Sequence, residues 1–289
     1  MSETRENIEP QTAETPSGKG AKDENFPVGS MLLPRVLRPH VGVFYAFARA
    51  IDDVADNPEL LPDEKIERLD SFDQALMGLN DDAAFEKAHI VRSSLIYTGV
   101  PIQHCRDLIS AFKQDAVKLR YDDWDDLMDY CDRSAAPVGR YLLDLHGVSK
   151  DLYPASDALC NALQVINHLQ DCQDDFREMN RVYLPQDWMV QAGVDVSDLD
   201  QPFTGRGLRR VLNQCLSETS ELLALARQLP GPMSSRRLAM ESAAIVRIAE
   251  RLVYELRRRD PLAERVALTK PQYLMCCVLG IIRLFLGTR

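Results

Sequence analysis

The sequence predicts an all-α protein. Apolar residues recur at three- and four-residue intervals along most of the chain, strand-like alternation is absent, and the turn signals between apolar segments are short. The helical period first appears in Phe44, Tyr45, Ala48 and Ile51, behind Pro39, which a first helical turn tolerates. We therefore expect the first helix to begin near Pro39.

Further helices are expected wherever this period continues between turn signals. The predicted segments are Pro62–Met77, Ala83–Thr98, Ile102–Leu119, Trp124–His146, Ala155–Arg177, Gly207–Gln228, Ser234–Arg258 and Lys270–Phe285. Short turns such as Gly99-Val100-Pro101 and Pro230-Gly231-Pro232 separate them, and no linker is long enough to divide the chain. Residues 22–289 are therefore predicted to form one helical domain. Residues 1–21 contain almost nothing to bury and are predicted to be a disordered tail.

Composition excludes several classes of protein. The net charge of -10 argues against sequence-independent nucleic-acid binding, which needs a basic surface, so no nucleic-acid partner is expected. The seven cysteines include no CxxC pair, which suggests neither a disulfide framework nor a zinc site. Because the N-terminal segment also lacks the apolar core of a secretory signal, we expect a reduced, cytoplasmic protein.

The C-terminal segment Tyr273–Leu286 is the most apolar part of the chain. It is interrupted by Arg283 and falls short of the ~20 residues that span a bilayer. Two interpretations stay open: a buried helix, or a helix that lies on the cytoplasmic membrane as a peripheral attachment.

Two acidic stripes carry the strongest signal for chemistry. Tyr45, Arg49, Asp52 and Asp56 fall on one face of the first predicted helix, because 100° per residue brings positions i, i+4, i+7 and i+11 together.

The second stripe lies on the segment Ala155–Arg177 and repeats the D-x-x-x-D spacing. It consists of Gln164, Asn167, Asp171 and Asp175. A transition-metal site built on His168 and Asp171 is the competing interpretation, but no second histidine lies nearby in the sequence.

Acidic pairs one turn apart are often only a solvated helix surface. Here apolar residues border both stripes, which favours an internal cavity. Carboxylate oxygens suit Mg²⁺, whose shell is usually completed by phosphate, and glycine-rich phosphate loops are missing from the sequence. Two facing stripes therefore predict several Mg²⁺ ions holding one diphosphate.

The chain resembles the squalene and phytoene synthases, the head-to-head prenyl synthases, over nearly its whole length after the tail. The resemblance rests on both stripes and on further motifs: Asn25-Phe26 with Leu32-Leu33-Pro34, Phe112-x-x-Asp115, Tyr130-Cys131 with Val138-Gly139, Arg181-x-Tyr183-x-Pro185, and Arg265-Val266. It implies a single-domain isoprenoid synthase helical bundle with a central cavity between two aspartate-rich helices.

The same resemblance implies roles for individual residues. Asp52, Asp56, Asp171 and Asp175 would handle magnesium, and Tyr130 would lie against the reacting carbons. The substrate would be bound by Tyr45, Arg49, Asp53, Gln164, Asn167, Arg181, Tyr183 and Arg265.

Departures from the general family pattern point to one branch. Gln170 stands where the family carries Arg, and Ser134-Ala135-Ala136-Pro137 replaces the usual Val-Ala-Gly. With Glu24-Asn25-Phe26-Pro27, these segments resemble the hydroxysqualene synthases of bacterial hopanoid pathways, in which presqualene diphosphate ionises and water captures the rearranged cation. Positions Ser134 and Gln170 are therefore where we expect the pocket to differ.

Two other functions stay open. The same residues would serve a squalene or phytoene-type condensation of two prenyl diphosphates, and some relatives are non-catalytic assembly factors, although those tend to lose the aspartates. The expected cofactor is Mg²⁺ without NADPH. The expected partners are presqualene diphosphate, a membrane surface and neighbouring pathway enzymes.

Overall fold

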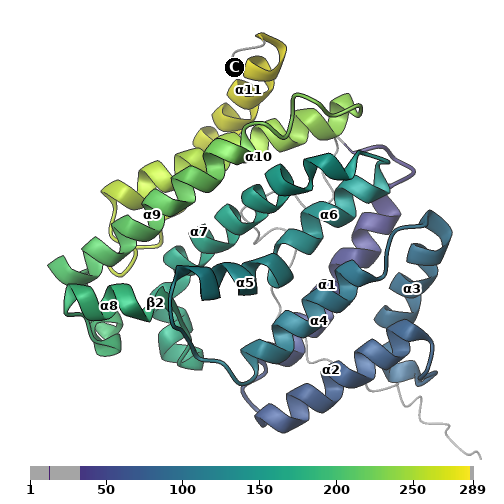
Figure 1. The fold of residues 1–289 in the computed structure, drawn as a ribbon, viewed down its shortest axis with the longest axis horizontal. Helices are drawn as coiled ribbons and strands as arrows, with labels where there is room; N and C mark the ends of the chain where they lie inside the picture. The colour runs from purple at the N-terminus through teal and green to yellow at the C-terminus, as the bar shows by residue number, and fades with distance from the viewer. Residues whose placement is uncertain (1–12, 14–32, 287–289) are drawn as a thin grey trace, which may run out of the picture.

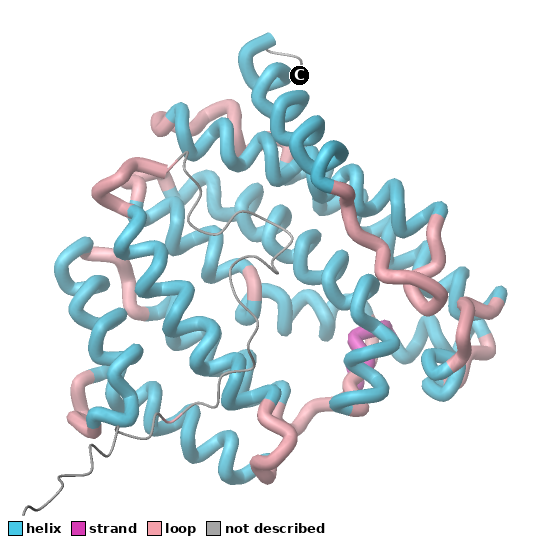
Figure 2. The backbone as a smooth tube through the Cα atoms, turned by 180° about the vertical axis from the view of Figure 1, so that it is seen from behind, coloured by secondary structure: helices cyan, strands magenta, loops and turns pink. Residues whose placement is uncertain are grey.

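The structure is a computed structural model that describes residue 13 and residues 33–286. It is built almost wholly from α-helices (Figure 1, Figure 2). The helices are α1 Arg38–Asp56, α2 Pro62–Met77, α3 Glu86–Thr98, α4 Gln103–Asp115, α5 Trp124–Ser134, α6 Ala136–Leu145, α7 Tyr153–Met179, α8 Gln186–Ala192, α9 Arg206–Ala226, α10 Arg236–Arg258 and α11 Lys270–Leu286. The prediction of an all-α fold is confirmed.

Helix α7 is the central element of the bundle. It packs against α5 and α6 on one side and against α9 and α10 on the other, and α1 packs against α3 and α4 (Figure 1). Buried residues occur around most of the circumference of α7, as expected for a helix with neighbours on several sides. The two helices that carry the acidic stripes, α1 and α7, therefore both belong to the core of one bundle.

The predicted helix Trp124–His146 is wrong in one respect, because the structure divides it into α5 and α6. The break falls at Ala135, whose φ of -124° is not helical, and Pro137 follows in the first turn of α6. Proline has no backbone N–H to continue the helical hydrogen bonds, so the chain starts a new helix there. The break brings Ser134 and Gly139 to the inside of the bundle.

A two-stranded parallel ladder adds a feature that the sequence did not predict. Strand β1, Arg120–Tyr121, pairs with β2, Val182–Pro185, so the segment after α4 is tied to the segment after α7. Short 3₁₀ turns at Ala83–Phe85, Lys150–Leu152 and Val196–Asp200 complete the connections. The ladder holds Arg181 and Tyr183 beside the C-terminal end of α4, where Asp115 lies.

Helix α11 does not form the buried C-terminal helix that was one of the two interpretations. Its contact with α10 is made through buried Cys276 and Gly280, while Leu274 and Phe285 are more than 60% exposed. None of the described helices is long and apolar enough to cross a membrane. The C-terminal helix is thus an element of the surface.

The predicted tail, residues 1–21, lies outside the described residues except for Ala13. The backbone N–H of Ala13 donates to the Ala84 carbonyl at 3.1 Å, and its carbonyl accepts from Arg68 at 3.0 Å. At least this point of the segment has defined partners on the bundle.

Candidate active site

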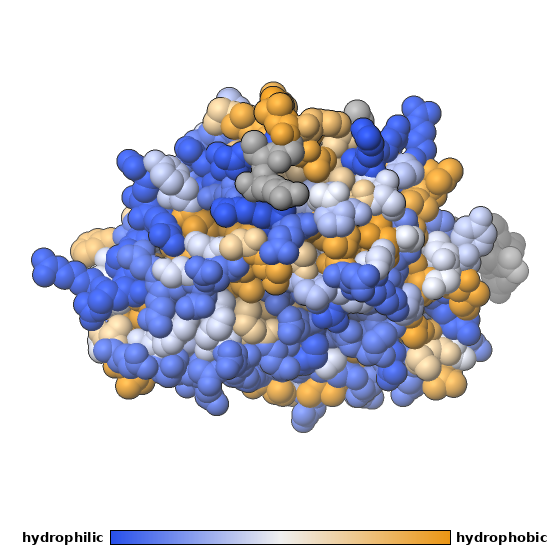
Figure 3. Space-filling view, turned by 45° about the horizontal axis from the view of Figure 1, so that its top comes forward, coloured by the Kyte–Doolittle hydropathy of each residue, from blue (hydrophilic) through white to orange (hydrophobic). Residues whose placement is uncertain are grey.

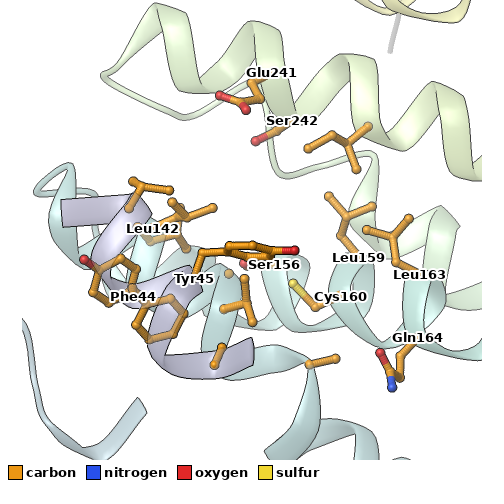
Figure 4. A pocket seen from close by; sticks show the side chains of 18 of the residues that line it. Phe44, Tyr45, Leu142, Ser156, Leu159, Cys160, Leu163, Gln164, Glu241 and Ser242 are labelled. Atoms are coloured by element: carbon orange, nitrogen blue, oxygen red, sulfur yellow. The ribbon is translucent and has the colours of Figure 1, made fainter. Parts of the chain in front are cut away.

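The described part of the chain encloses a cavity of about 360 Å³ between α1, α6, α7 and α10 (Figure 4). Its walls are mostly apolar and include Phe44, Leu142, Leu159 and Leu163. The fold therefore provides the internal cavity that the apolar borders of the two stripes predict.

The two stripes face one another across one part of this cavity. Helix α1 contributes Tyr45, Arg49 and Asp52 to the wall, and α7 contributes Gln164 and Asn167. Each set follows a helical spacing, so the amphipathic pattern of the sequence is what turns these polar groups inward. Five of the predicted site residues are thereby brought together.

The remaining aspartates of the stripes lie further along the two helices. Asp171 is exposed and Asp175 is half-buried, one and two turns beyond Asn167 on α7, and Asp56 ends α1. None of the three is among the residues that line the cavity. We call the part of the cavity lined by Arg49, Asp52 and Asn167 its polar end. The three aspartates continue the stripes outward from there.

Arg49 holds two carboxylates of its own helix. Its Nη1 donates to Asp52 Oδ2 at 2.5 Å, and its Nη2 donates to Asp53 Oδ1 at 2.9 Å. Asp53 is only 8% exposed and contacts Arg49, and its role in substrate binding stays a prediction.

Asp52 is the most perturbed carboxyl group of the site. Burial, followed by the nearby charge of Asp56, raises its pKa to about 8, although Arg49 acts in the opposite direction. A carboxylate that is costly to ionise alone gains most from an added cation, because the cation removes the repulsion. Asp52 is therefore suited to bind positive charge at the polar end of the cavity.

Behind this end lies a buried cluster around Asp115, the last residue of α4. Tyr130 Oη donates to Asp115 Oδ2 at 2.5 Å, and Tyr183 Oη donates to Asp115 Oδ1 at 3.2 Å. Burial raises the pKa of Asp115 to about 6, against the opposing effects of Arg181 and the two phenols. Tyr130 is 2% exposed and is not among the residues that line the cavity, so its contact with reacting carbons stays a prediction.

His168 belongs to the same cluster. Its ring stacks on Tyr183 with the centroids 3.6 Å apart, and burial together with the charge of Arg181 lowers its pKa to about 3. Among the described residues, no three His, Cys, Asp or Glu side chains are arranged to hold a metal ion. The alternative of a transition-metal site on His168 and Asp171 therefore has no support in this arrangement.

Arg265 is placed outside the cavity. It is exposed, and its carbonyl accepts a hydrogen bond from Arg259. The next residue, Val266, is fully buried, and the Gln170 amide donates to its carbonyl. Of the two positions where the pocket was expected to differ, Ser134 lines the cavity and Gln170 instead ties this loop to α7.

The sequence did not predict several polar residues of the wall, among them Ser156, Glu241 and Ser242. Glu241 and Ser242 lie on α10 and line the cavity on the side away from Gln164 (Figure 4). Asp115 was also missed as a site residue, although it ends the Phe112-x-x-Asp115 motif. The only sequence signal for Glu241 is an acidic residue within the helical spacing of Leu238 and Ile245.

The donor set suits a Mg²⁺ ion better than a metal ion whose ligands all come from the protein. Asp52 and Asp56 on α1 and Asp171 and Asp175 on α7 offer only oxygen ligands, and no three of them converge. Mg²⁺ commonly binds one or two carboxylates and takes its other ligands from water and substrate phosphate. Carboxylates divided between two helices match that requirement.

Comparison with known proteins gives consistent matches. A model of the squalene/phytoene synthase family matches residues 20–272. The chain is 42% identical to a hydroxysqualene synthase of Rhodopseudomonas palustris over 263 residues, covering 91% of this chain and 89% of that one. It is 43% identical to a hydroxysqualene synthase of Zymomonas mobilis over 260 residues, covering 89% and 87%.

A solved structure resembles the fold described above. The crystal structure of squalene synthase HpnC from Alicyclobacillus acidocaldarius superposes with a TM-score of 0.70 at 31% identity, covering 80% of this chain and 87% of that one.

Proposed function

The chain belongs to the squalene/phytoene synthase family, and from this premise we propose that it is a hydroxysqualene synthase. The reaction converts presqualene diphosphate and water to hydroxysqualene and diphosphate. The observation that carries the proposal is the identity of 42–43% to two hydroxysqualene synthases over about nine-tenths of the chain. The chain is thus an enzyme that acts on a prenyl diphosphate.

The cavity suits a substrate with one charged end and a long hydrocarbon. Arg49, Gln164 and Asn167 carry donors that suit the oxygens of a diphosphate, and Tyr45 lies beside them. The apolar walls would surround the hydrocarbon and exclude bulk water, which protects a carbocation from early capture. Polar groups gathered at one end of an apolar cavity also fix the direction in which the substrate enters.

We assign magnesium to the four stripe aspartates, Asp52, Asp56, Asp171 and Asp175. Bound between these carboxylates and the diphosphate, Mg²⁺ would neutralise the negative charge that develops on the leaving group. The raised pKa of Asp52 supports the assignment, because burial and Asp56 disfavour its charge when no further cation is present. Arg181, which contacts Asp56, would compensate part of the charge of that aspartate.

We keep the predicted roles of three further residues in the enzyme with bound substrate: Tyr130, Tyr183 and Arg265. A phenol ring near the cavity would stabilise a carbocation through its π face. Arg265 would reach a phosphate oxygen only if the loop held by Gln170 turns its side chain toward α7.

Product analysis tests the proposal directly. The enzyme is incubated with presqualene diphosphate and Mg²⁺, with and without NADPH, and the products are identified by mass. Hydroxysqualene formed equally in both reactions is the expected result. Squalene formed only with NADPH would overturn the hydroxysqualene assignment while leaving the family assignment intact.

Condensation of two prenyl diphosphates is the second candidate, since the chain also resembles a solved squalene synthase at 31% identity. Incubation with farnesyl diphosphate and Mg²⁺ separates the two. Turnover of farnesyl diphosphate at a rate comparable to that of presqualene diphosphate would favour condensation.

We also propose that α11 attaches the enzyme to the surface of the cytoplasmic membrane. Its exposed side chains include Leu274, Val278, Ile282 and Phe285, and Figure 3 shows apolar residues gathered at the upper edge, the side on which α11 lies in Figure 1. Such a face would pass long hydrocarbons to the bilayer without a path through water. Cosedimentation with anionic vesicles tests this attachment, and recovery of all the protein in the supernatant would contradict it.

A further inference from the structure

The carbonyl group of Ala55 is held by two cations that come from outside its own helix. Lys65 Nζ donates to the Ala55 oxygen at 2.7 Å, and Arg181 Nη2 donates to the same oxygen at 3.0 Å. Lys65 lies on α2 and Arg181 follows α7, whereas the last turn of α1 contains no basic residue. An ammonium and a guanidinium therefore meet at the C-terminal end of α1, next to the stripe aspartate Asp56.

The two cations differ in how firmly they are held. Arg181 is 4% exposed, and its other terminal nitrogen donates to Asp56 at 2.6 Å. Lys65 is half-buried, and its ammonium binds the Ala55 carbonyl. An ammonium at the end of a flexible lysine stem can turn to a new partner, whereas this arginine is fixed at two points. Because Arg181 stays on the Ala55 oxygen, Lys65 can leave without depriving a buried carbonyl of its last donor.

The surrounding charges indicate what would move Lys65. Burial and the nearby charge of Arg181 lower the pKa of Lys65, while Asp56 and Asp115 act in the opposite direction. The two cations thus repel each other and are held together by two carboxylates. Magnesium bound at Asp56 would neutralise that carboxylate and add positive charge beside both cations. An anion is then the partner that the cations require, and the substrate carries one at its charged end.

We propose that Lys65 is a further diphosphate-binding residue. Its ammonium moves from the Ala55 carbonyl to an oxygen of the diphosphate when Mg²⁺ and the substrate bind between the two stripes. The inference rests on the proposed function, because it takes the stripe aspartates as the magnesium site. An ammonium binds phosphate oxygens as a point charge, without the fixed geometry of a guanidinium. Lys65 thus adds a donor from α2 to those that α1 and α7 supply.

The contact assists the reaction at the leaving group. When the carbon–oxygen bond breaks, its electron pair goes to the diphosphate, whose negative charge increases as the carbocation forms. A cation in contact with the diphosphate therefore stabilises the transition state more than the bound substrate. Lys65 acts through its charge and transfers no proton, so the overall reaction is unchanged.

A purely structural role for Lys65 predicts a different behaviour. Basic side chains often bind the last carbonyls of a helix and only stabilise its end. In that case, loss of Lys65 would weaken the binding of Mg²⁺ and of diphosphate alike, because Asp56 would be held less well. If Lys65 binds diphosphate, loss of its charge instead favours Mg²⁺ alone and disfavours diphosphate.

The variant Lys65→Gln separates these two cases. Inorganic diphosphate is titrated into the enzyme with Mg²⁺ present and followed by calorimetry, and binding of Mg²⁺ alone is measured from the rise in unfolding temperature. The dissociation constant of diphosphate should increase about 10-fold, as expected when a charge-assisted hydrogen bond is lost. That of Mg²⁺ alone should stay the same or decrease. Lys65→Arg keeps the charge and should bind diphosphate within about threefold of the unchanged enzyme.

Lys113→Gln is the matched control, because the Lys113 ammonium contacts Asp70 on α2 and not the end of α1. Both of its dissociation constants should stay unchanged. If Lys65→Gln does not fold, as judged by thermal unfolding, Lys65→Met keeps the apolar stem and carries the test.

Three results would overturn the inference: unchanged diphosphate binding in the folded variant, equal weakening of Mg²⁺ and diphosphate binding, or unfolding of both the Lys65→Gln and Lys65→Met variants. Failure of the proposed function has a different signature. An unchanged enzyme that binds diphosphate through Lys65 but forms no hydroxysqualene from presqualene diphosphate would refute that function and leave the role of Lys65 intact.

Discussion

The guanidinium of Arg181 lies 2.6 Å from a carboxylate oxygen of Asp56, and the two residues are 125 positions apart in the sequence. A second nitrogen of Arg181 donates to the Ala55 carbonyl at 3.0 Å. The end of α1, which carries one acidic stripe, is thus fastened to the segment that follows α7, which carries the other. Arg181 is 4% exposed and also lies close enough to lower the pKa of Asp115.

Replacing Arg181 with Gln should therefore lower both stability and activity. Asp56 and buried Asp115 would lose a shared cation, and we expect a loss of about 2 kcal/mol in the free energy of unfolding. Urea unfolding measures the effect. Arg177→Gln is the control, because Arg177 pairs with Asp200 at the surface and should change stability by less than about 1 kcal/mol. Equal losses in the two variants would contradict a special role for Arg181.

The fold was predictable because its helices keep one period over long segments. The segments Pro62–Met77 and Ser234–Arg258 agree with α2 and α10 to within two residues, since burial on one face repeats at each turn. The division of Trp124–His146 was missed, although Pro137 marks it, because the apolar period continues across the break. The ladder of β1 and β2 was missed because strands of two and four residues are too short to show alternation.

The site was predictable where it depends on a repeated spacing. Asp52 and Asn167 share helical stripes with other polar residues, so the cavity face of each helix could be found from the sequence. Asp115 and Glu241 were missed because each is a single acidic residue whose surroundings come from other helices. Gln170 was found as a departure from the family, but only packing reveals that it holds Val266.

Acid should destabilise the enzyme through His168. Its pKa is lowered from 6.5 to about 3 in the folded protein, so the unfolded chain binds a proton at pH values where the folded protein does not. Stability from this group is complete above pH 6.5 and is lost as the pH falls toward 3, at about 1.4 kcal/mol per pH unit.

Chemical unfolding at several pH values between 4.5 and 7.5 measures this slope. His168→Gln should flatten it, because the glutamine side chain does not titrate. The same slope in His168→Gln and in the unchanged protein would show that other groups cause the acid sensitivity.

Helix α11 depends on a close approach at Gly280. A Cβ atom there would lie 2.4 Å from the Ala243 carbonyl oxygen and 2.9 Å from Ala244 Cα, both backbone atoms of α10 that cannot move aside. Gly280→Ala should therefore destabilise the protein by about 1–3 kcal/mol, although alanine is the better helix former. Thermal unfolding measures the loss. Val278→Ala, on the exposed side of α11, is the control and should change little. A stabilised Gly280→Ala variant would mean that α11 does not pack at this distance.

The proposed magnesium site makes stability and activity respond in opposite directions. Asp52→Asn removes a charge that burial and Asp56 disfavour, so the variant should unfold at the same temperature as the unchanged enzyme or a higher one. Its turnover should nevertheless fall by at least about 100-fold, because a ligand that helps the leaving group is lost. Asp171→Asn, on the facing helix, should show the same loss of turnover.

Asp174→Asn is the control, since Asp174 is exposed on α7 and lies outside the D-x-x-x-D stripe. Diphosphate release measured over a range of Mg²⁺ concentrations checks the assignment, and the two stripe variants should require more metal for half of their residual rate. Near-normal turnover in a folded Asp52→Asn or Asp171→Asn enzyme would remove that residue from the proposed metal site, whereas a loss of turnover accompanied by unfolding would place its role in the fold.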